Sequence, residues 1–307
     1  MKFGFSLIVR GNDATLDTFA AVAERAEALQ LDSLWLSAHV IVPPQVKSGY
    51  VMVPGLKHPE HWKEAYWEPF TVMSYLSAIT TTVQLGTSIV VLPMHNPIEV
   101  AKQVAEVDQL SGGRFIFGVG VGWFEEEFEA LGQNYANRGA RTDDALQLMK
   151  RLWADDPVTY NGDFYSVTDC CFSPKPKQLP HPPIWIAGAS RPAYRRAARF
   201  GDVFHPARMP VEKVVAAKAE IAEFCEHYGR ARDAVGIAMK MPIVFKDGPP
   251  VEGEFATQGR VRDIIDGINR YLEIGAEHFV LDVVPEKLDH ALDTMERFAQ
   301  EVRPKLG

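Results

Sequence analysis

Three features are scarce in this 307-residue sequence: cysteine, excess basic charge and long apolar runs. The cysteines, Cys170, Cys171 and Cys225, form neither a zinc-ligand spacing nor an even disulfide framework, which favours a reducing compartment. The 32 basic residues are outnumbered by 40 acidic ones, and no basic block is long enough to bind a phosphate backbone, so no nucleic-acid partner is expected. No stretch approaches the roughly 20 apolar residues of a membrane helix, and Arg10 interrupts the first apolar run too early for a signal peptide. These absences predict a soluble, cytoplasmic protein without a membrane partner.

Apolar runs of strand length alternate with segments of helical periodicity along the whole chain. We count eight such pairs, with strands expected at residues 2–9, 33–36, 83–93, 115–119, 184–187, 201–206, 236–245 and 278–284. Parallel strands that are joined by helical crossovers form an α/β fold. The length and the number of pairs predict one (β/α)8 TIM barrel that uses residues 1–307 as a single domain, with a doubly wound sheet as the alternative.

Two segments interrupt this alternation. Residues 40–66 are rich in proline, glycine, histidine and aromatic residues, and a loop of this length inside a compact domain is usually functional. Residues 155–183 contain Asn161-Gly162 between two β-prone runs, followed by five prolines, which predicts an inserted β-hairpin and an extended lead-in to the next strand. We therefore expect a barrel with two insertions.

In a barrel of this kind the site lies at the carboxyl ends of the strands, and two glycine-containing loops fall there. The run GVGVGW places Gly120 and Gly122 after one strand, where they could allow either close strand packing or the close approach of a flat ring or a phosphate. The run AGASRP places Gly188, Ala189 and Ser190 before a helix, and the amides of such a loop together with the helix dipole form an anion site.

Histidines and acidic residues near the strand ends are weaker candidates. His39 could exchange a proton at the barrel mouth, although a single histidine is more often structural. His58 and His61 lack the carboxylates or cysteines of a metal site. The acidic run at residues 125–127 is expected to be a solvated helix start that the helix dipole favours. No Ser-His-Asp, phosphate-loop or zinc pattern is present, so no metal is expected.

Several stretches nevertheless resemble one family. They are LGTSIVVLPMHNP, KQVAEVDQLSGGRFIFGVGVGWFEEEFEALG, RGARTDDALQLMKRLW and PKPKQLPHPPIWIAGAS, and they are similar to the bacterial-luciferase-like superfamily, in particular to its coenzyme F420-dependent oxidoreductases. The similarity covers nearly the whole chain, and residues 83–123 are its most specific part.

The resemblance implies a TIM barrel, usually a homodimer, with a deazaflavin or flavin in the barrel mouth. It places a non-prolyl cis peptide at Ser88-Ile89, against which the ring would rest, and His39 near the reactive carbon. The cofactor phosphate would lie on Gly120, Val121 and residues 188–190. Trp123 stands where sugar-phosphate dehydrogenases of the family have a glutamate, so an apolar or aromatic substrate is expected. Its pocket would be lined by four aromatic residues, Trp62, Tyr66, Trp67 and Trp123.

Three functions stay open at this point. The first is hydride transfer between coenzyme F420 and a small organic substrate. The second is a two-component monooxygenase that uses O2 and reduced FMN from a separate flavin reductase. The third is a flavin-binding protein without turnover. A metal-dependent hydrolase ranks last because the strand ends lack metal ligands.

Overall fold

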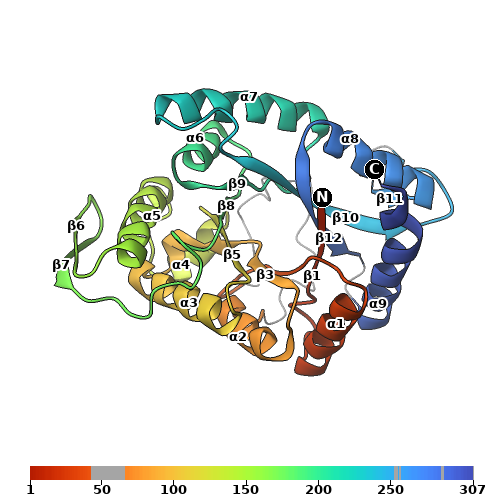
Figure 1. The fold of residues 1–307 in the computed structure, drawn as a ribbon, viewed down its shortest axis with the longest axis horizontal. Helices are drawn as coiled ribbons and strands as arrows, with labels where there is room; N and C mark the ends of the chain where they lie inside the picture. Colours follow the sequence, from red (N-terminus) through yellow and green to blue (C-terminus); the bar gives the residue numbers. More distant parts are fainter. Residues whose placement is uncertain (43–65, 252–254, 256, 285–286, 307) are drawn as a thin grey trace.

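The computed structural model describes residues 1–42, 66–251, 255, 257–284 and 287–306. Within these residues, eight parallel strands close into a barrel in the order β1, β2, β3, β5, β8, β9, β10 and β12, and β12 pairs with β1 to complete the ring. Helices surround these strands, as Figure 1 shows. The predicted TIM-barrel fold is therefore confirmed.

The bounds of the elements follow the predicted alternation closely. The strands are β1 Lys2–Ser6, β2 Ser33–Leu36, β3 Gln84–Thr87, β4 Val90–Val91, β5 Phe115–Gly120, β6 Val158–Asn161, β7 Ser166–Cys170, β8 Ile184–Ile186, β9 Val203–Phe204, β10 Gly236–Phe245, β11 Gln258–Gly259 and β12 Ala276–Val283. The helices are α1 Leu16–Ala28, α2 Pro69–Ile79, α3 Pro97–Leu110, α4 Glu125–Ala130, α5 Arg138–Ala154, α6 Arg191–Phe200, α7 Val211–His227, α8 Val261–Glu273 and α9 Leu288–Arg297.

Alternation along each strand divides the core into two layers. Leu34 and Leu36 of β2 belong to the main cluster between the strands and the helices, whereas Trp35 belongs to a smaller cluster with Trp185 and Val280. Trp35 and Trp185 pack with their ring centroids 4.4 Å apart, and both are almost fully buried. Because successive side chains of a strand point to opposite faces, this smaller cluster fills the barrel interior.

The helix starts are set by local chemistry that the sequence already displays. The side chain of Thr15 accepts a hydrogen bond from the N–H of Thr18 at the start of α1, and Asn96 accepts one from Ile98 at the start of α3. Such N-caps satisfy amides that have no partner inside the helix. They fix where each helix begins and thus where the preceding loop of the barrel mouth ends.

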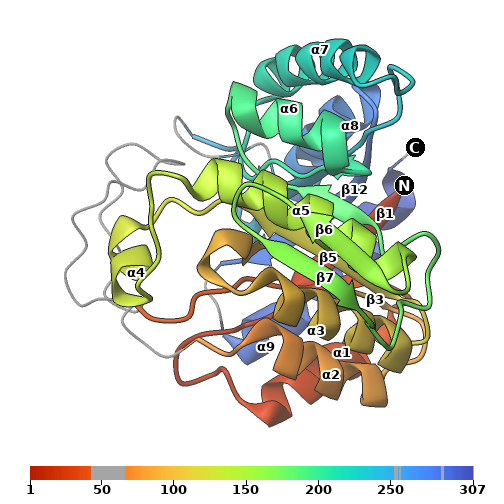
Figure 2. The same cartoon turned by 90° about the vertical axis from the view of Figure 1, so that its left-hand side faces the viewer.

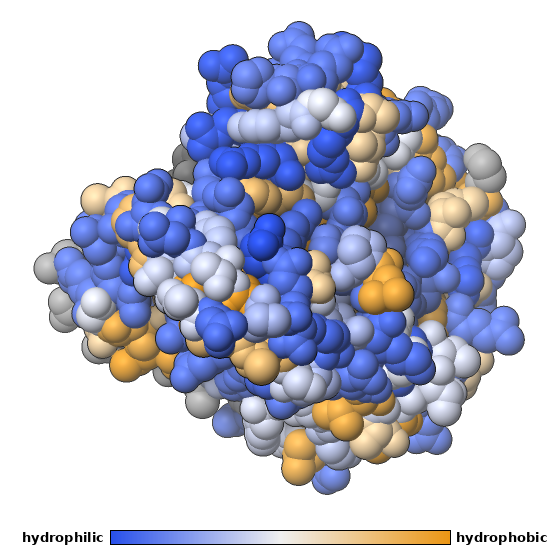
Figure 3. Space-filling view, turned by 60° about the vertical axis from the view of Figure 1, so that its left-hand side comes forward, coloured by the Kyte–Doolittle hydropathy of each residue, from blue (hydrophilic) through white to orange (hydrophobic). Residues whose placement is uncertain are grey.

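The predicted hairpin is present, since β6 and β7 pair antiparallel. It lies on the outside of the barrel beside α5 (Figure 2). Asp144 of α5 attaches it by accepting hydrogen bonds from the Phe164 and Tyr165 amides, at 2.8 and 3.0 Å, and from the Tyr160 hydroxyl. None of the described helices is long and apolar enough to cross a membrane. The surface in Figure 3 is mainly hydrophilic, with apolar residues in small separate groups.

Candidate active site at the barrel mouth

A histidine and a buried glutamate pair where β2 ends. His39 Nδ1 lies 2.8 Å from the Glu127 carboxylate, and the backbone amides of Val40 and Ile41 donate to the same side chain at 2.6 and 3.3 Å. Glu127 is fully buried within α4, whereas 15% of the His39 side chain is exposed. The expectation that the whole acidic run is solvated is therefore wrong for Glu127.

This pairing determines which ring nitrogen can act. An ionised carboxylate only accepts hydrogen bonds, so Nδ1 of His39 carries the proton that is shared with Glu127. Nε2 is then the ring nitrogen that does not contact Glu127. A histidine whose second nitrogen is oriented by a buried carboxylate is the usual arrangement of a general acid or base.

The spacing of the aromatic residues around Glu127 indicates that this glutamate is buried, although the run at residues 125–127 is acidic. Phe124, at the N-cap of α4, and Phe128 are almost fully buried, and Glu127 is three residues after Phe124, on the same side of the helix. An acidic residue on the apolar face of a short helix needs internal partners. The partners come from the end of β2, about 90 positions earlier in the sequence.

The loop after β3 forms the floor of the mouth, and its Ser88-Ile89 peptide bond is cis, as the family resemblance implies. The Ser88 hydroxyl lies 2.9 Å from Nε2 of His205, while Nδ1 of His205 donates to the Ala238 carbonyl at 3.0 Å. Burial is the main cause that lowers the pKa of His205 to about 4, so its ring is neutral near pH 7. Because Nδ1 carries the single proton, Nε2 accepts from Ser88.

Gly118 and Gly120 of β5 leave no room for a side chain, because other protein atoms occupy the space where a β-carbon would lie. A β-carbon at Gly118 would lie 1.8 Å from the Thr87 carbonyl oxygen, and one at Gly120 would lie 2.7 Å from Ile89 Cδ1. These glycines thus let β5 approach the loop after β3, in agreement with the packing alternative. Their direct effect is on the position of Ile89, which forms part of the floor.

The loop before α6 has the features of a phosphate site. Gly188 adopts a φ of 132°, which favours glycine, and it leads into exposed Ala189 and Ser190 at the start of α6. Ser190 is the residue at the N-cap position, yet its side chain makes no capping hydrogen bond. The hydroxyl, the loop amides and the helix dipole all favour an anion here, so these residues fit a cofactor phosphate. Val121, after β5, is partly exposed.

The expected aromatic lining is partly assembled. The rings of Tyr66 and Phe124 contact His39 edge to face, with centroids 4.9 and 6.1 Å away, and Trp123 stacks on Phe124 at 5.0 Å. Trp67 instead packs against Phe19 of α1 and donates its indole N–H to a backbone carbonyl. Trp62, together with His58, His61 and most of the predicted lid at 40–66, lies outside the described residues.

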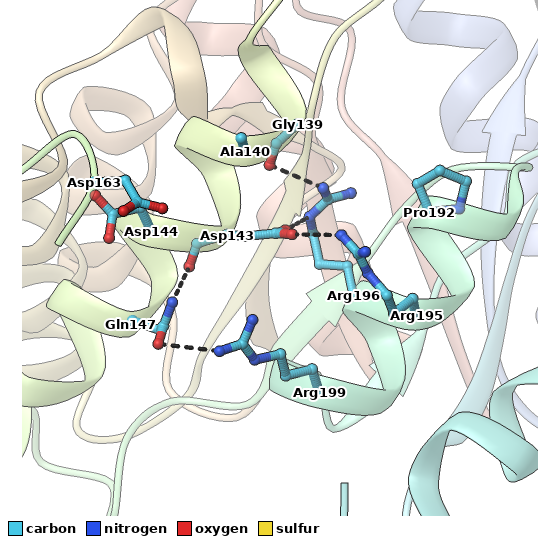
Figure 4. Close-up of a pocket in the computed structure, with 10 residues that line it drawn as sticks. All are labelled: Gly139, Ala140, Asp143, Asp144, Gln147, Asp163, Pro192, Arg195, Arg196 and Arg199. Carbon is cyan, nitrogen blue, oxygen red and sulfur yellow. Dashed lines mark hydrogen bonds and ion pairs between the residues drawn. The ribbon is translucent and has the colours of Figure 1, made fainter. Parts of the chain in front are cut away.

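A separate cavity lies between α5 and α6 and has a volume of about 390 Å³. Figure 4 shows Arg196 and Arg195 converging on Asp143, to which they donate at 2.5 and 3.0 Å, while Arg199 donates to Gln147. The charges of its lining residues are largely neutralised by one another. No group of three metal-binding side chains occurs in the described parts of the chain.

The closed (β/α)8 barrel thus places the His39–Glu127 pair at its mouth and a loop that favours an anion before α6. In the comparison with protein families, residues 1–276 match the luciferase-like monooxygenase family. The chain belongs to this family, and it is an enzyme of the oxidoreductase class.

One protein of similar sequence and two solved structures of similar fold were found. The FMNH2-dependent dimethylsulfone monooxygenase of Pseudomonas putida is 32% identical over 183 residues, which cover 59% of this chain and 49% of that protein. The chain thus aligns with about half the length of this relative. The monooxygenase RslO1 of Streptomyces bottropensis superposes with a TM-score of 0.81 at 21% identity over 99% of both chains. The coenzyme F420-dependent tetrahydromethanopterin reductase of Methanopyrus kandleri superposes with a TM-score of 0.78 at 15% identity over 100% and 99% of the two chains. At these identities the two structures show the fold alone.

Proposed function

We propose that the protein is a coenzyme F420-dependent oxidoreductase that transfers a hydride between the deazaflavin and a small organic substrate. The observation that carries this proposal is the pair of His39 with the buried Glu127 at the mouth of the barrel. When bound, the deazaflavin supplies a ring carbon that accepts or donates a hydride. All other functions in the site belong to side chains and amides of this chain.

The His39 pair supplies the proton that must accompany a hydride. Reduction of a carbonyl group leaves negative charge on its oxygen, and oxidation of an alcohol requires removal of the hydroxyl proton. In this proposal His39 serves either direction, because Glu127 holds its Nδ1 in place and Nε2 exchanges the proton with the substrate. Positioned acid-base groups of this kind contribute about 10²- to 10⁴-fold to a rate.

Two loops would hold the cofactor. Residues 188–190 would bind its phosphate through backbone amides and the Ser190 hydroxyl. The floor formed by Ser88 and Ile89 would support its ring, and this floor is fixed by the bond of Ser88 to the neutral His205. An ordered floor matters because the reacting atoms must approach to roughly 3–3.5 Å.

FMN is the second candidate, and the similarity to the FMNH2-dependent dimethylsulfone monooxygenase favours it. In that case the protein would be a monooxygenase that receives reduced flavin from a separate reductase. The same loops would bind the phosphate, so the fold does not separate the two cofactors. A binding protein without turnover is disfavoured, since a buried carboxylate that orients a histidine is costly without a use. Homodimer formation stays a prediction.

Parallel fluorescence titrations of the protein with oxidised coenzyme F420 and with FMN test the proposal. We expect micromolar affinity for the deazaflavin and much weaker binding of FMN. The reverse order would support the monooxygenase, and binding of neither would refute both. The variant His39→Gln should bind the cofactor normally and lose turnover about 10²- to 10⁴-fold. The matched control is His227→Gln, because His227 is exposed on α7.

A further inference from the structure

A charged layer lies above the aromatic core of the barrel. Lys240 of β10 donates to Ser37 Oγ at 3.1 Å and to the Ser88 carbonyl at 3.2 Å, and its ammonium lies 3.5 Å from Asp282 of β12. Asp282 also accepts from Ser6 at 2.6 Å. Ser37 is two residues before His39, so the charged layer borders the proposed acid-base group.

The layer has one more positive than negative charge. Asp282 is the carboxylate that pairs with both Lys240 and Arg208 among the described ion pairs, and its distance to Arg208 is 3.8 Å. The side chains of Lys240 and Asp282 are only 12% and 17% exposed. The nearby His205 is neutral and adds no charge. Excess positive charge in such a poorly hydrated place is unfavourable, and an anion would relieve it.

Arg208 is the member of the layer that can reach a ligand. Its backbone is fixed, because its N–H donates to the Lys240 carbonyl at 2.7 Å and its φ is 53°. Its side chain is 28% exposed, and within the described residues its guanidinium makes only the long contact with Asp282. Lys240, in contrast, already donates hydrogen bonds to Ser37 Oγ and to the Ser88 carbonyl. A guanidinium with unused donors in a planar arrangement suits a carboxylate, which it can bind through two parallel hydrogen bonds.

We propose that Arg208, supported electrostatically by Lys240, binds a carboxylate of the substrate, so that the enzyme acts on organic acids. A monoanion matches the single excess charge, whereas a phosphate dianion exceeds it. The aromatic residues near His39 would contact the rest of the molecule. The inference depends on the proposed function, because it names the substrate class of that same site.

Isothermal titration with acid and amide pairs tests the carboxylate site. The probes are benzoate and benzamide, phenylacetate and phenylacetamide, and cinnamate and cinnamamide, applied to the cofactor-free and the cofactor-saturated protein. At least one acid should bind about tenfold or more tightly than its amide, as expected for a charge-assisted bidentate contact. Arg208→Gln should abolish this preference, and Arg208→Lys should retain part of it. Asp282→Asn should strengthen acid binding because it removes the competing carboxylate. The control is Arg199→Gln, since Arg199 is exposed on α6.

The proposal is overturned if no acid is preferred over its amide, or if the preference persists in Arg208→Gln. It is also overturned if Arg208→Gln weakens deazaflavin binding and leaves acid binding unchanged, since the cation would then serve the cofactor. Failure of the cofactor titrations would refute the proposed function separately, because the acid preference can be measured on the cofactor-free protein. Thermal melting of each variant confirms that it is folded.

Discussion

Replacing Glu127 should change both the stability and the tautomer of the site. Three N–H groups donate to this buried carboxylate at 2.6, 2.8 and 3.3 Å, and each charge-assisted bond contributes about 1.5–3 kcal/mol. Val40 and Ile41 are about half exposed, so their amides can turn to water and recover part of the loss. We therefore expect Glu127→Ala to lower the free energy of unfolding by about 3 kcal/mol, and not by the full sum.

The variant Glu127→Gln separates the chemical effect from the structural one. Its amide oxygen can still accept from Val40 and Ile41, so the loss of stability should be only about 1 kcal/mol. Its NH2 group must then donate to Nδ1 of His39, which moves the ring proton to Nε2. Turnover should fall about 10²- to 10⁴-fold, with cofactor affinity unchanged.

Nitrogen-15 NMR of the histidine rings measures this tautomer directly and needs no substrate. The His39 signals can be assigned among the nine histidines by comparison with His39→Gln. The wild type should show a protonated Nδ1, and Glu127→Gln should show a protonated Nε2. Urea denaturation of the same proteins gives the free energies of unfolding. An unchanged tautomer in Glu127→Gln, or a Glu127→Ala protein as stable as the wild type, would refute the reasoning.

Three further predictions follow from buried contacts. Burial lowers the pKa of His205 from 6.5 to about 4, so the unfolded chain takes up this proton at a higher pH than the folded protein does. The contribution of His205 to the free energy of unfolding is therefore complete above about pH 6.5 and falls by about 3 kcal/mol as the pH drops to 4. The free energies of unfolding of the wild type and of His205→Gln, measured by urea denaturation, should therefore approach each other by that amount between pH 6.5 and pH 4. A difference that does not change with pH would contradict this. Gly118→Ala should destabilise by about 3 kcal/mol or more in thermal melts, because its β-carbon would overlap the Thr87 carbonyl oxygen, whereas Gly248→Ala meets nothing within 4 Å and should be neutral. Asp144→Asn should speed proteolysis within the β6–β7 hairpin and change the melting temperature little, and protection equal to wild type would argue against this anchor.

Much of the fold could be predicted because its signals are local. Strand and helix periodicity, the N-caps at Thr15 and Asn96 and the hairpin signal at Asn161-Gly162 each depend on residues within a few positions of one another, although Asn161 is the last paired residue of β6 and the turn itself spans residues 162–165. The alternation of strands and helices with short connections then left few possible topologies. The residues that end each strand could be named for the same reason, including His39 and Ser88.

What those residues contact was decided only by closure of the barrel. The bonds of His39 to Glu127, of Ser88 to His205 and of Ser37 to Lys240 join residues that are 88, 117 and 203 positions apart. Periodicity shows which face of an element is buried, but it does not identify the partner across the barrel. The acidic run around Glu127 and the apolar strand around Lys240 therefore do not identify the partners of these two residues. Glu127 becomes the buried partner of His39, and Lys240 becomes part of the charged layer, because the tertiary structure removes both from water and places each beside residues from other parts of the chain.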